Sequence, residues 1–269
     1  SLNEPFRKDD DKRKDPLGPV ATRSNLIQIY EKLINQDARH HLQSIRTAGQ
    51  LYALMLGRNR DEVWAELEKP LKDLDRIQGA PSHLLMLYLL MRRETLGCDV
   101  GQLKDVAKLL VSFFVRRNLT DLPPTRDLTR LFMEIIDKVS DTPGHSVLTI
   151  VRDKLLTVSA SDEVFRSRLE GGLYDENAGV TRFVLCALAE QSMTRENWVD
   201  LWKYDGKLFV WTIEHIFPQG ENIPASWVTM IAGGDSVRAK GIQETHVHKL
   251  GNLTISGFNS ALGNKSFKD

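Results

Sequence analysis

From about residue 24 to residue 191, apolar residues recur at intervals of three and four positions. The first such run contains Leu26, Ile29, Tyr30, Leu33 and Ile34. Because an α-helix completes a turn in 3.6 residues, this spacing places the apolar side chains on one face of each helix. Residues 84–91 are apolar on every side, which predicts a helix at the centre of a bundle. Glycine and proline positions divide the region, so we expect six to eight helices.

Shorter pieces replace the helical pattern after about residue 202. Residues 209–213 are rich in β-branched and aromatic side chains, which favour a strand, and residues 253–255 predict a second short strand. We expect an irregular loop between the two strands and a closing helix over residues 258–268. Two strands and a helix around a metal ion form the minimal ββα-metal arrangement.

The sequence predicts a mainly α fold with three parts. Residues 1–19 mix Lys, Arg, Asp and Glu with almost no apolar side chains, so they cannot offset the entropy of ordering and should form a flexible linker. Residues 20–202 should form the multi-helix bundle, and residues 203–269 the small C-terminal ββα-metal module. Because the chain opens on a linker, we expect a further N-terminal domain before it.

Charge and hydropathy restrict the kind of partner that this chain can have. The 36 basic and 36 acidic residues cancel, so no overall positive field indicates a nucleic-acid partner. Any DNA contact must therefore depend on a local patch, on a metal ion or on another domain. The longest apolar run is far shorter than the roughly 20 residues of a membrane span, and no secretion signal opens the chain. We therefore expect a cytoplasmic protein without membrane contact.

An acidic residue and a histidine stand side by side in the C-terminal module, at Glu214 and His215, shortly before Pro218. Phosphodiester hydrolysis needs an activated water and a cation that neutralises the charge growing on the phosphorus. A histidine is neutral and basic near working pH, so we assign His215 as the general base. Glu214 is a hard oxygen ligand for a divalent metal, Mg²⁺ or Mn²⁺. We expect both side chains to flank one pocket because the strand should fray there.

Amide and basic side chains downstream complete the predicted site. Asn259 is our second metal ligand. Asn252 is expected either to act directly in catalysis or to bond backbone groups of the loop and so hold His215 in orientation. Of His246 and His248, at most one should face the pocket. The candidate phosphate or DNA contacts are His248, Lys249, Asn264, Lys265 and Lys268.

Three motifs carry a resemblance to a known family. They read IEHIFPQ at residues 213–219, LGNLTI at residues 250–255 and NSALGNKSF at residues 259–267. In this order they resemble the C-terminal HNH, or His-Me finger, nuclease region of GmrSD-type type IV restriction endonucleases and related phage-defence nucleases. A looser similarity reaches into the helical part at residues 115–119, 123–125 and 181–185. Members of this family usually continue past the position of Asp269, so the resemblance implies that the last helix is incomplete.

The resemblance implies a hydrolase of a bacterial restriction or antiviral defence system that nicks or cleaves modified or foreign DNA with the help of a metal ion. It also implies a separate N-terminal domain that hydrolyses nucleotides and senses the target. The chain contains no GxxxxGK phosphate loop, so we expect no nucleotide site within it. One alternative stays open at this point, a helical DNA- or partner-binding module whose HNH motif is degenerate and inactive.

Overall fold

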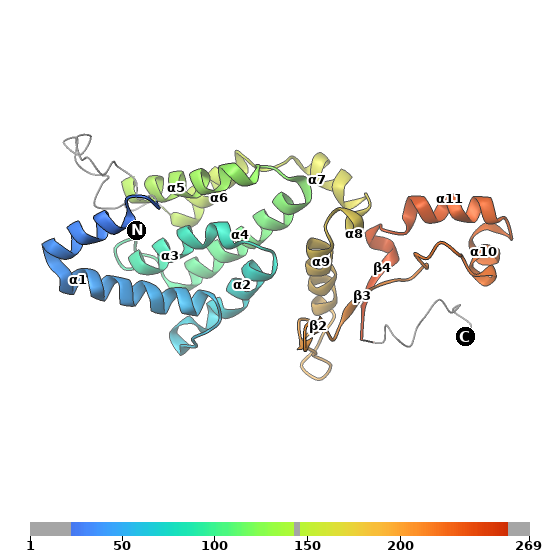
Figure 1. The fold of residues 1–269 in the computed structure, drawn as a ribbon, viewed down its shortest axis with the longest axis horizontal. Helices are drawn as coiled ribbons and strands as arrows, with labels where there is room; N and C mark the ends of the chain where they lie inside the picture. Colours follow the sequence, from blue (N-terminus) through green and yellow to red (C-terminus); the bar gives the residue numbers. More distant parts are fainter. Residues whose placement is uncertain (1–22, 143–145, 258–269) are drawn as a thin grey trace. The chain divides into compact units, whose positions relative to one another are not determined.

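The computed structural model describes residues 23–142 and 146–257, which are mainly helical, as predicted (Figure 1). The chain divides into two compact units. Of the described residues, the first unit comprises 23–75, 79–109, 128–142 and 146–153, and the second comprises 76–78, 110–127 and 154–257. These units differ from the predicted division after residue 202, which stays a prediction.

The first unit contains most of the helices that precede residue 154. They are α1 (Leu26–Met55), α2 (Ala65–Arg76), α3 (His83–Arg92) and most of α5 (Thr125–Asp141), together with the first parts of α4 (Val100–Thr120) and α6 (Val147–Leu156) and the 3₁₀ turns η3 (Glu62–Trp64) and η4 (Ala80–Ser82). Helix α3 is the predicted central helix, and Leu85, Met86 and Leu89 on it are completely buried. Helix α1 is kinked where Asp37 leaves the helical conformation.

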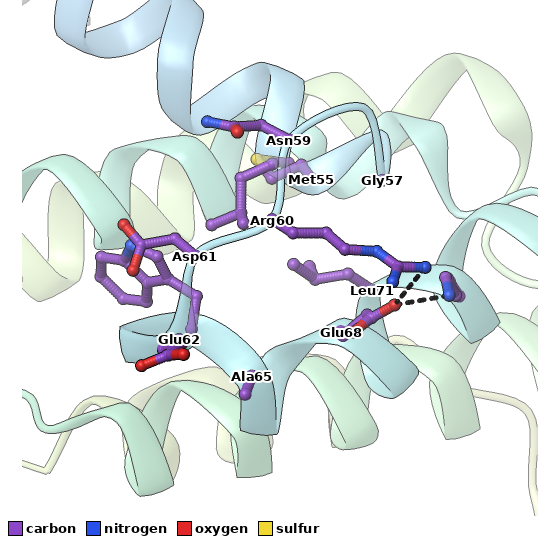
Figure 2. Close-up of a pocket in the computed structure, with 12 residues that line it drawn as sticks. Met55, Gly57, Asn59, Arg60, Asp61, Glu62, Ala65, Glu68 and Leu71 are labelled. Atoms are coloured by element: carbon purple, nitrogen blue, oxygen red, sulfur yellow. Dashed lines mark hydrogen bonds and ion pairs between the residues drawn. The ribbon is translucent and has the colours of Figure 1, made fainter.

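A cavity of about 250 Å³ lies in the first unit, between the end of α1 and the start of α2. Figure 2 shows the side chain of Arg60 extending across it towards Glu68. Glu68 is paired with both Arg60, at 3.7 Å, and Lys72, at 2.7 Å. The carboxylate of Glu68 is therefore already paired within the protein, and none of the predicted site residues lines the cavity.

The second unit contains the shorter helices and every strand that the structure describes. The helices are α7 (Asp162–Leu169), α8 (Leu173–Glu176), α9 (Ala178–Gln191), α10 (Ala225–Ala232) and α11 (Ser236–His246), with the 3₁₀ turn η5 (Leu250–Asn252). The strands form two antiparallel pairs, β1 (Tyr204–Asp205) with β2 (Leu208–Phe209) and β3 (Thr212–His215) with β4 (Leu253–Ser256). Helix α9 packs against β4.

The predicted strand over residues 209–213 is divided between β2 and β3, because the backbone changes its partner there. The N–H of Val210 still pairs with the hairpin of β1 and β2, donating to the carbonyl of Lys203. The carbonyl of Trp211 then accepts a hydrogen bond from the buried guanidinium of Arg182 at 2.7 Å. Pairing with β4 begins only at Thr212. The second predicted strand is confirmed as β4.

The segment between the two strands of the site is helical, so the prediction of an irregular loop was wrong. Helices α10 and α11 form a hairpin there (Figure 1). Gly233 ends α10 in the left-handed conformation with φ 64°, and Asp235 begins α11 by accepting the N–H groups of Val237 and Arg238. Gly233 is thus a helix cap, and Gly234 lies in the turn between the two helices. Residues 258–268, where the closing helix is predicted, lie outside the described residues.

None of the helices described here is both long and apolar enough to cross a lipid bilayer.

Candidate active site

His215 stands at the end of β3, where the strand pair meets the loop that leads into α10. In the ladder it faces Leu253, and Glu214 faces Thr254. The half-buried imidazole of His215 meets the imidazole of His248, with 3.3 Å between His215 Nε2 and His248 Nδ1. The structure thus brings together two histidines that lie 33 positions apart in the sequence.

Tyr174, on the short helix α8, supports both of these imidazoles. Its ring meets the His215 ring edge-on, with centroids 4.8 Å apart, and lies nearly parallel to the His248 ring at 5.7 Å. Its backbone N–H also donates to the carbonyl oxygen of His248 at 3.1 Å. Leu173, the preceding residue, is completely buried, and its carbonyl accepts a hydrogen bond from the buried Thr181. The backbone that carries the Tyr174 ring is therefore fixed by hydrogen bonds and by the burial of Leu173.

Glu214 leaves β3 on the face opposite to His215. Its Oε1 accepts a hydrogen bond from the hydroxyl of Thr212 at 2.8 Å, as expected because alternate residues of a strand share a face. His215 is still paired in the ladder, so the strand does not fray at this position. The two side chains make separate contacts, and their expected convergence on one pocket is not seen among these contacts.

Asn252 holds the two ends of the site together through its amide side chain. Its Oδ1 accepts the N–H of Phe217 at 2.8 Å, and its Nδ2 donates to the carbonyls of Phe217 at 3.2 Å and Val247 at 2.8 Å. Its own carbonyl accepts the N–H of Ile216. These contacts match the supporting role that we expected for Asn252, since its amide is engaged with loop backbone.

Gln243, on α11, fixes the loop that follows His215. Its side chain is 3% exposed, and its Nε2 donates to the carbonyls of Pro218 at 2.7 Å and Gly220 at 2.9 Å. The ammonium group of Lys240 donates to its Oε1 at 3.0 Å. Helix α11 is thereby tied to the Pro218 segment, although nothing in the local sequence marks this glutamine as a loop anchor.

Arg182, on α9, anchors the chain immediately before β3. Besides the carbonyl of Trp211, its guanidinium donates to the carbonyl of Leu201 at 2.5 Å. The guanidinium carbon lies 3.6 Å from the centre of the Phe209 ring, a cation–π contact that favours the charged form in a buried place. Burial nevertheless lowers the pKa of Arg182 from its ordinary value.

The surroundings of His215 favour its neutral form. Burial lowers the pKa of His215, and the neighbouring His248 lowers it further. A neutral imidazole has a lone pair with which to accept a proton, so the environment agrees with the assignment of this residue as a base.

The other predicted residues fall into two groups. His248 and Lys249 lie beside the site and are half-buried, whereas His246 is exposed, with its Nδ1 3.1 Å from the carbonyl of Ile242 in the helix α11. Of these two histidines, only His248 contacts His215. Four further candidates lie outside the described residues: Asn259, Asn264, Lys265 and Lys268.

Within residues 23–142 and 146–257, no three or more His, Cys, Asp or Glu side chains are grouped so as to hold a metal ion. Glu214 is the one predicted metal ligand that the structure describes. Thr212 engages its Oε1, and no hydrogen bond is found for its Oε2 in the described part of the chain. One carboxylate with a free oxygen fits the way in which Mg²⁺ binds proteins, through one or two carboxylates and several waters.

Comparison with known proteins agrees with the motifs. No curated protein and no solved structure shows a significant match to the chain. One family model does match, that of the C-terminal domain of GmrSD restriction endonucleases, and it covers residues 159–269. This span contains β3, β4 and all the side chains described above. The resemblance inferred from the motifs is thus confirmed: residues 159–269 match the C-terminal domain of GmrSD restriction endonucleases.

Proposed function

We propose that the second unit is a metal-dependent DNA endonuclease module of a bacterial restriction or antiviral defence protein. The single observation that carries the proposal is the position of His215, half-buried at the end of β3 beside His248, inside the span that matches the restriction endonuclease family. DNA is the substrate in this proposal, modified or foreign DNA in particular. A nucleotide-hydrolysing sensor domain, which the resemblance implies, is the proposed partner.

His215 accepts a proton from a water molecule that attacks a phosphodiester. The proton passes to the imidazole as the water oxygen forms a bond to phosphorus. The bond from phosphorus to the departing sugar oxygen breaks, and that oxygen takes a proton from solvent. Asn252 contributes indirectly, because its bonds to Phe217 and Val247 hold the backbone on both sides of the site.

Glu214 and Asn259 are the proposed ligands of a divalent cation, Mg²⁺ or Mn²⁺. When bound, such an ion would neutralise the charge that builds up on the phosphate oxygens. Glu214 presents one oxygen without a hydrogen bond from the described part of the chain, and its other oxygen is oriented by Thr212. Lys249 is the described candidate for a phosphate contact, because it is half-buried directly after His248.

The proposal is tested by incubating the full 269-residue chain with supercoiled plasmid and Mg²⁺ or Mn²⁺. Wild type should convert plasmid to the nicked form, and His215→Ala should abolish this while its circular dichroism spectrum stays unchanged. Removal of a general base costs about 10²- to 10⁴-fold in rate. His246→Ala is the matched control, since His246 is exposed on the same segment, and it should nick like wild type.

Two outcomes would overturn the assignment. Retention of metal-dependent nicking by His215→Ala would remove His215 as the base. A wild-type chain that binds DNA but neither nicks it nor shows a divalent-cation site by calorimetry would favour the alternative, a binding module with a degenerate motif. Glu214→Gln separates these cases, because loss of metal binding in that variant identifies its carboxylate as a ligand.

A further inference from the structure

We infer that His248 is a positioning residue that sets the proton arrangement of His215, with Tyr174 holding the two imidazoles in place. This inference rests on the proposed function of His215 as a base. It assigns to His248 a role that differs from a phosphate contact, because the nitrogen Nδ1 of His248 is directed at the other histidine.

The contact between the two imidazoles requires one hydrogen between two nitrogens. His215 Nε2 and His248 Nδ1 are 3.3 Å apart, so either nitrogen is the donor and the other the acceptor. If His248 donated, neutral His215 would carry its own hydrogen on Nδ1 and would have no lone pair for a water. If His215 donates from Nε2, its Nδ1 is free to accept a proton. Only the second arrangement is compatible with a base.

His248 in this arrangement is a neutral imidazole that accepts at Nδ1 and carries its hydrogen on Nε2. When His215 takes up a proton at Nδ1, its Nε2–H is already bonded to a neutral acceptor, so the proton is accepted without movement of either ring. His248 itself neither gains nor loses a proton. This is the role of an outer partner that fixes a tautomer, which typically affects activity about 10- to 100-fold.

Tyr174 explains why the two imidazoles keep this arrangement. It meets the His215 ring edge-on, stacks on the His248 ring and binds the His248 carbonyl through its own N–H. The planes of the two imidazoles are inclined at 81° to each other. The Tyr174 ring can contact both because it lies nearly parallel to the His248 ring and nearly perpendicular to the His215 ring. Loss of the ring should therefore release both histidines together.

The first test is a spectroscopic one and needs no activity. Long-range ¹H–¹⁵N NMR of the full chain labelled with ¹⁵N-histidine, assigned by comparison with His215→Ala and His248→Asn, reports which nitrogen of each imidazole carries the hydrogen. We expect His215 in the Nε2–H form in wild type and in His248→Asn, whose amide oxygen can accept near the original Nδ1. In His248→Leu, which has no acceptor, both tautomers of His215 should be populated. A wild-type His215 with its hydrogen on Nδ1 would overturn the inference.

The second test uses the nicking assay on the same variants. His248→Leu should lower kcat about 10- to 100-fold with little change in KM, and His248→Asn should recover most of that loss. Tyr174→Leu should resemble His248→Leu, and Tyr174→Phe, which keeps the ring, should recover most of that loss. Equal losses in His248→Asn and His248→Leu, expressed as a raised KM, would identify a phosphate contact instead.

The two readouts separate the inference from the function on which it rests. If wild type shows the Nε2–H form of His215 but does not nick DNA, the positioning contact stands and the nuclease assignment fails. If wild type nicks DNA but His248→Leu does so at the same kcat, the nuclease assignment stands and the positioning role of His248 is wrong.

Discussion

The side-chain amide of Asn252 pairs with the backbone of Phe217 at two points, accepting its N–H at 2.8 Å and donating to its carbonyl at 3.2 Å. One side chain thereby imitates the pairing of a strand beyond the last ladder position, which is His215 opposite Leu253. The loop after the strand pair is consequently ordered by an amide rather than by further β-structure.

Replacement of Asn252 by aspartate should destabilise the second unit. The substitution keeps the acceptor for Phe217 N–H but removes both donors, and it places a carboxylate against the carbonyls of Phe217 and Val247. We expect a loss of about 1–3 kcal/mol in the free energy of unfolding, measured by urea denaturation. Asn197→Asp is the matched control, because Asn197 is exposed and uses only its oxygen, to accept from Thr194. Similar losses in both variants would contradict the stabilising role of the two N–H donors of Asn252.

Arg182→Lys should destabilise the protein although it keeps the charge. A lysine ammonium cannot reach the carbonyls of Leu201 and Trp211 together as the planar guanidinium does. About 1–3 kcal/mol should be lost, the cost of one buried acceptor left without a donor. Arg168→Lys, in an exposed pair with Glu176, should change the free energy of unfolding by less than about 0.5 kcal/mol. Equal stability of Arg182→Lys and wild type in chemical denaturation would contradict this reasoning.

Gln243→Met should loosen the loop that follows His215 while leaving the helices in place. Methionine keeps the length of the side chain but cannot donate to the carbonyls of Pro218 and Gly220. Hydrogen exchange of backbone amides in residues 216–221 should accelerate by an amount equivalent to about 1–3 kcal/mol of local stability. Glu244→Gln, at the exposed neighbouring position, should leave exchange in this loop unchanged. If the amides of this loop exchange as slowly in Gln243→Met as in wild type, contacts other than those of Gln243 hold the loop.

The stability of the first unit should depend on pH through His83. Burial lowers the pKa of His83 below its ordinary value of 6.5, an effect that Asp75 opposes. The unfolded chain then binds a proton more readily than the folded one, so protonation removes stability as the pH falls below about 6.5 and has no effect well above it. His83→Phe keeps the ring contact with Tyr52 and cannot titrate.

The measurement for His83 is the free energy of unfolding of both proteins between about pH 8 and pH 5, where histidines titrate. At the upper end the two should differ by a constant amount. Below the ordinary pKa of histidine, wild type should lose more stability than His83→Phe as the pH falls. Parallel curves over the whole range would exclude His83 as the source of the pH dependence.

Much of the fold could be predicted because it depends on local patterns. The spacing of apolar residues predicted six to eight helices over residues 24–191, where the described residues form nine, α1 to α9, including the four-residue α8. The unbroken apolar run of residues 84–91 predicted the burial of α3. The helices α10 and α11 were missed because Gly233 and Gly234 indicate a break without indicating what precedes and follows it. The division between β2 and β3 could not be predicted either, since it arises when the distant Arg182 takes the carbonyl of Trp211.

The site could be predicted where its residues lie in short motifs, as His215 and Asn252 do. Tyr174 was missed because no motif surrounds it. Its contact with His248 exists only when α8 lies against the segment before η5, which is a property of the packed chain. The separate contacts of Glu214 and His215 follow from the ladder, which continues to His215, two residues beyond the end of the predicted strand.

The alternation of side chains along β3 restricts how this domain can diverge in length. One residue added or removed between Trp211 and Glu214 would exchange the faces on which Glu214 and His215 leave the strand, since its period is two residues. The exposed turn at Gly233 and Gly234 has no such constraint, because an insertion there lengthens a hairpin tip without changing any register. Length variation in relatives of this chain should therefore accumulate between α10 and α11, while β3 changes by substitution alone.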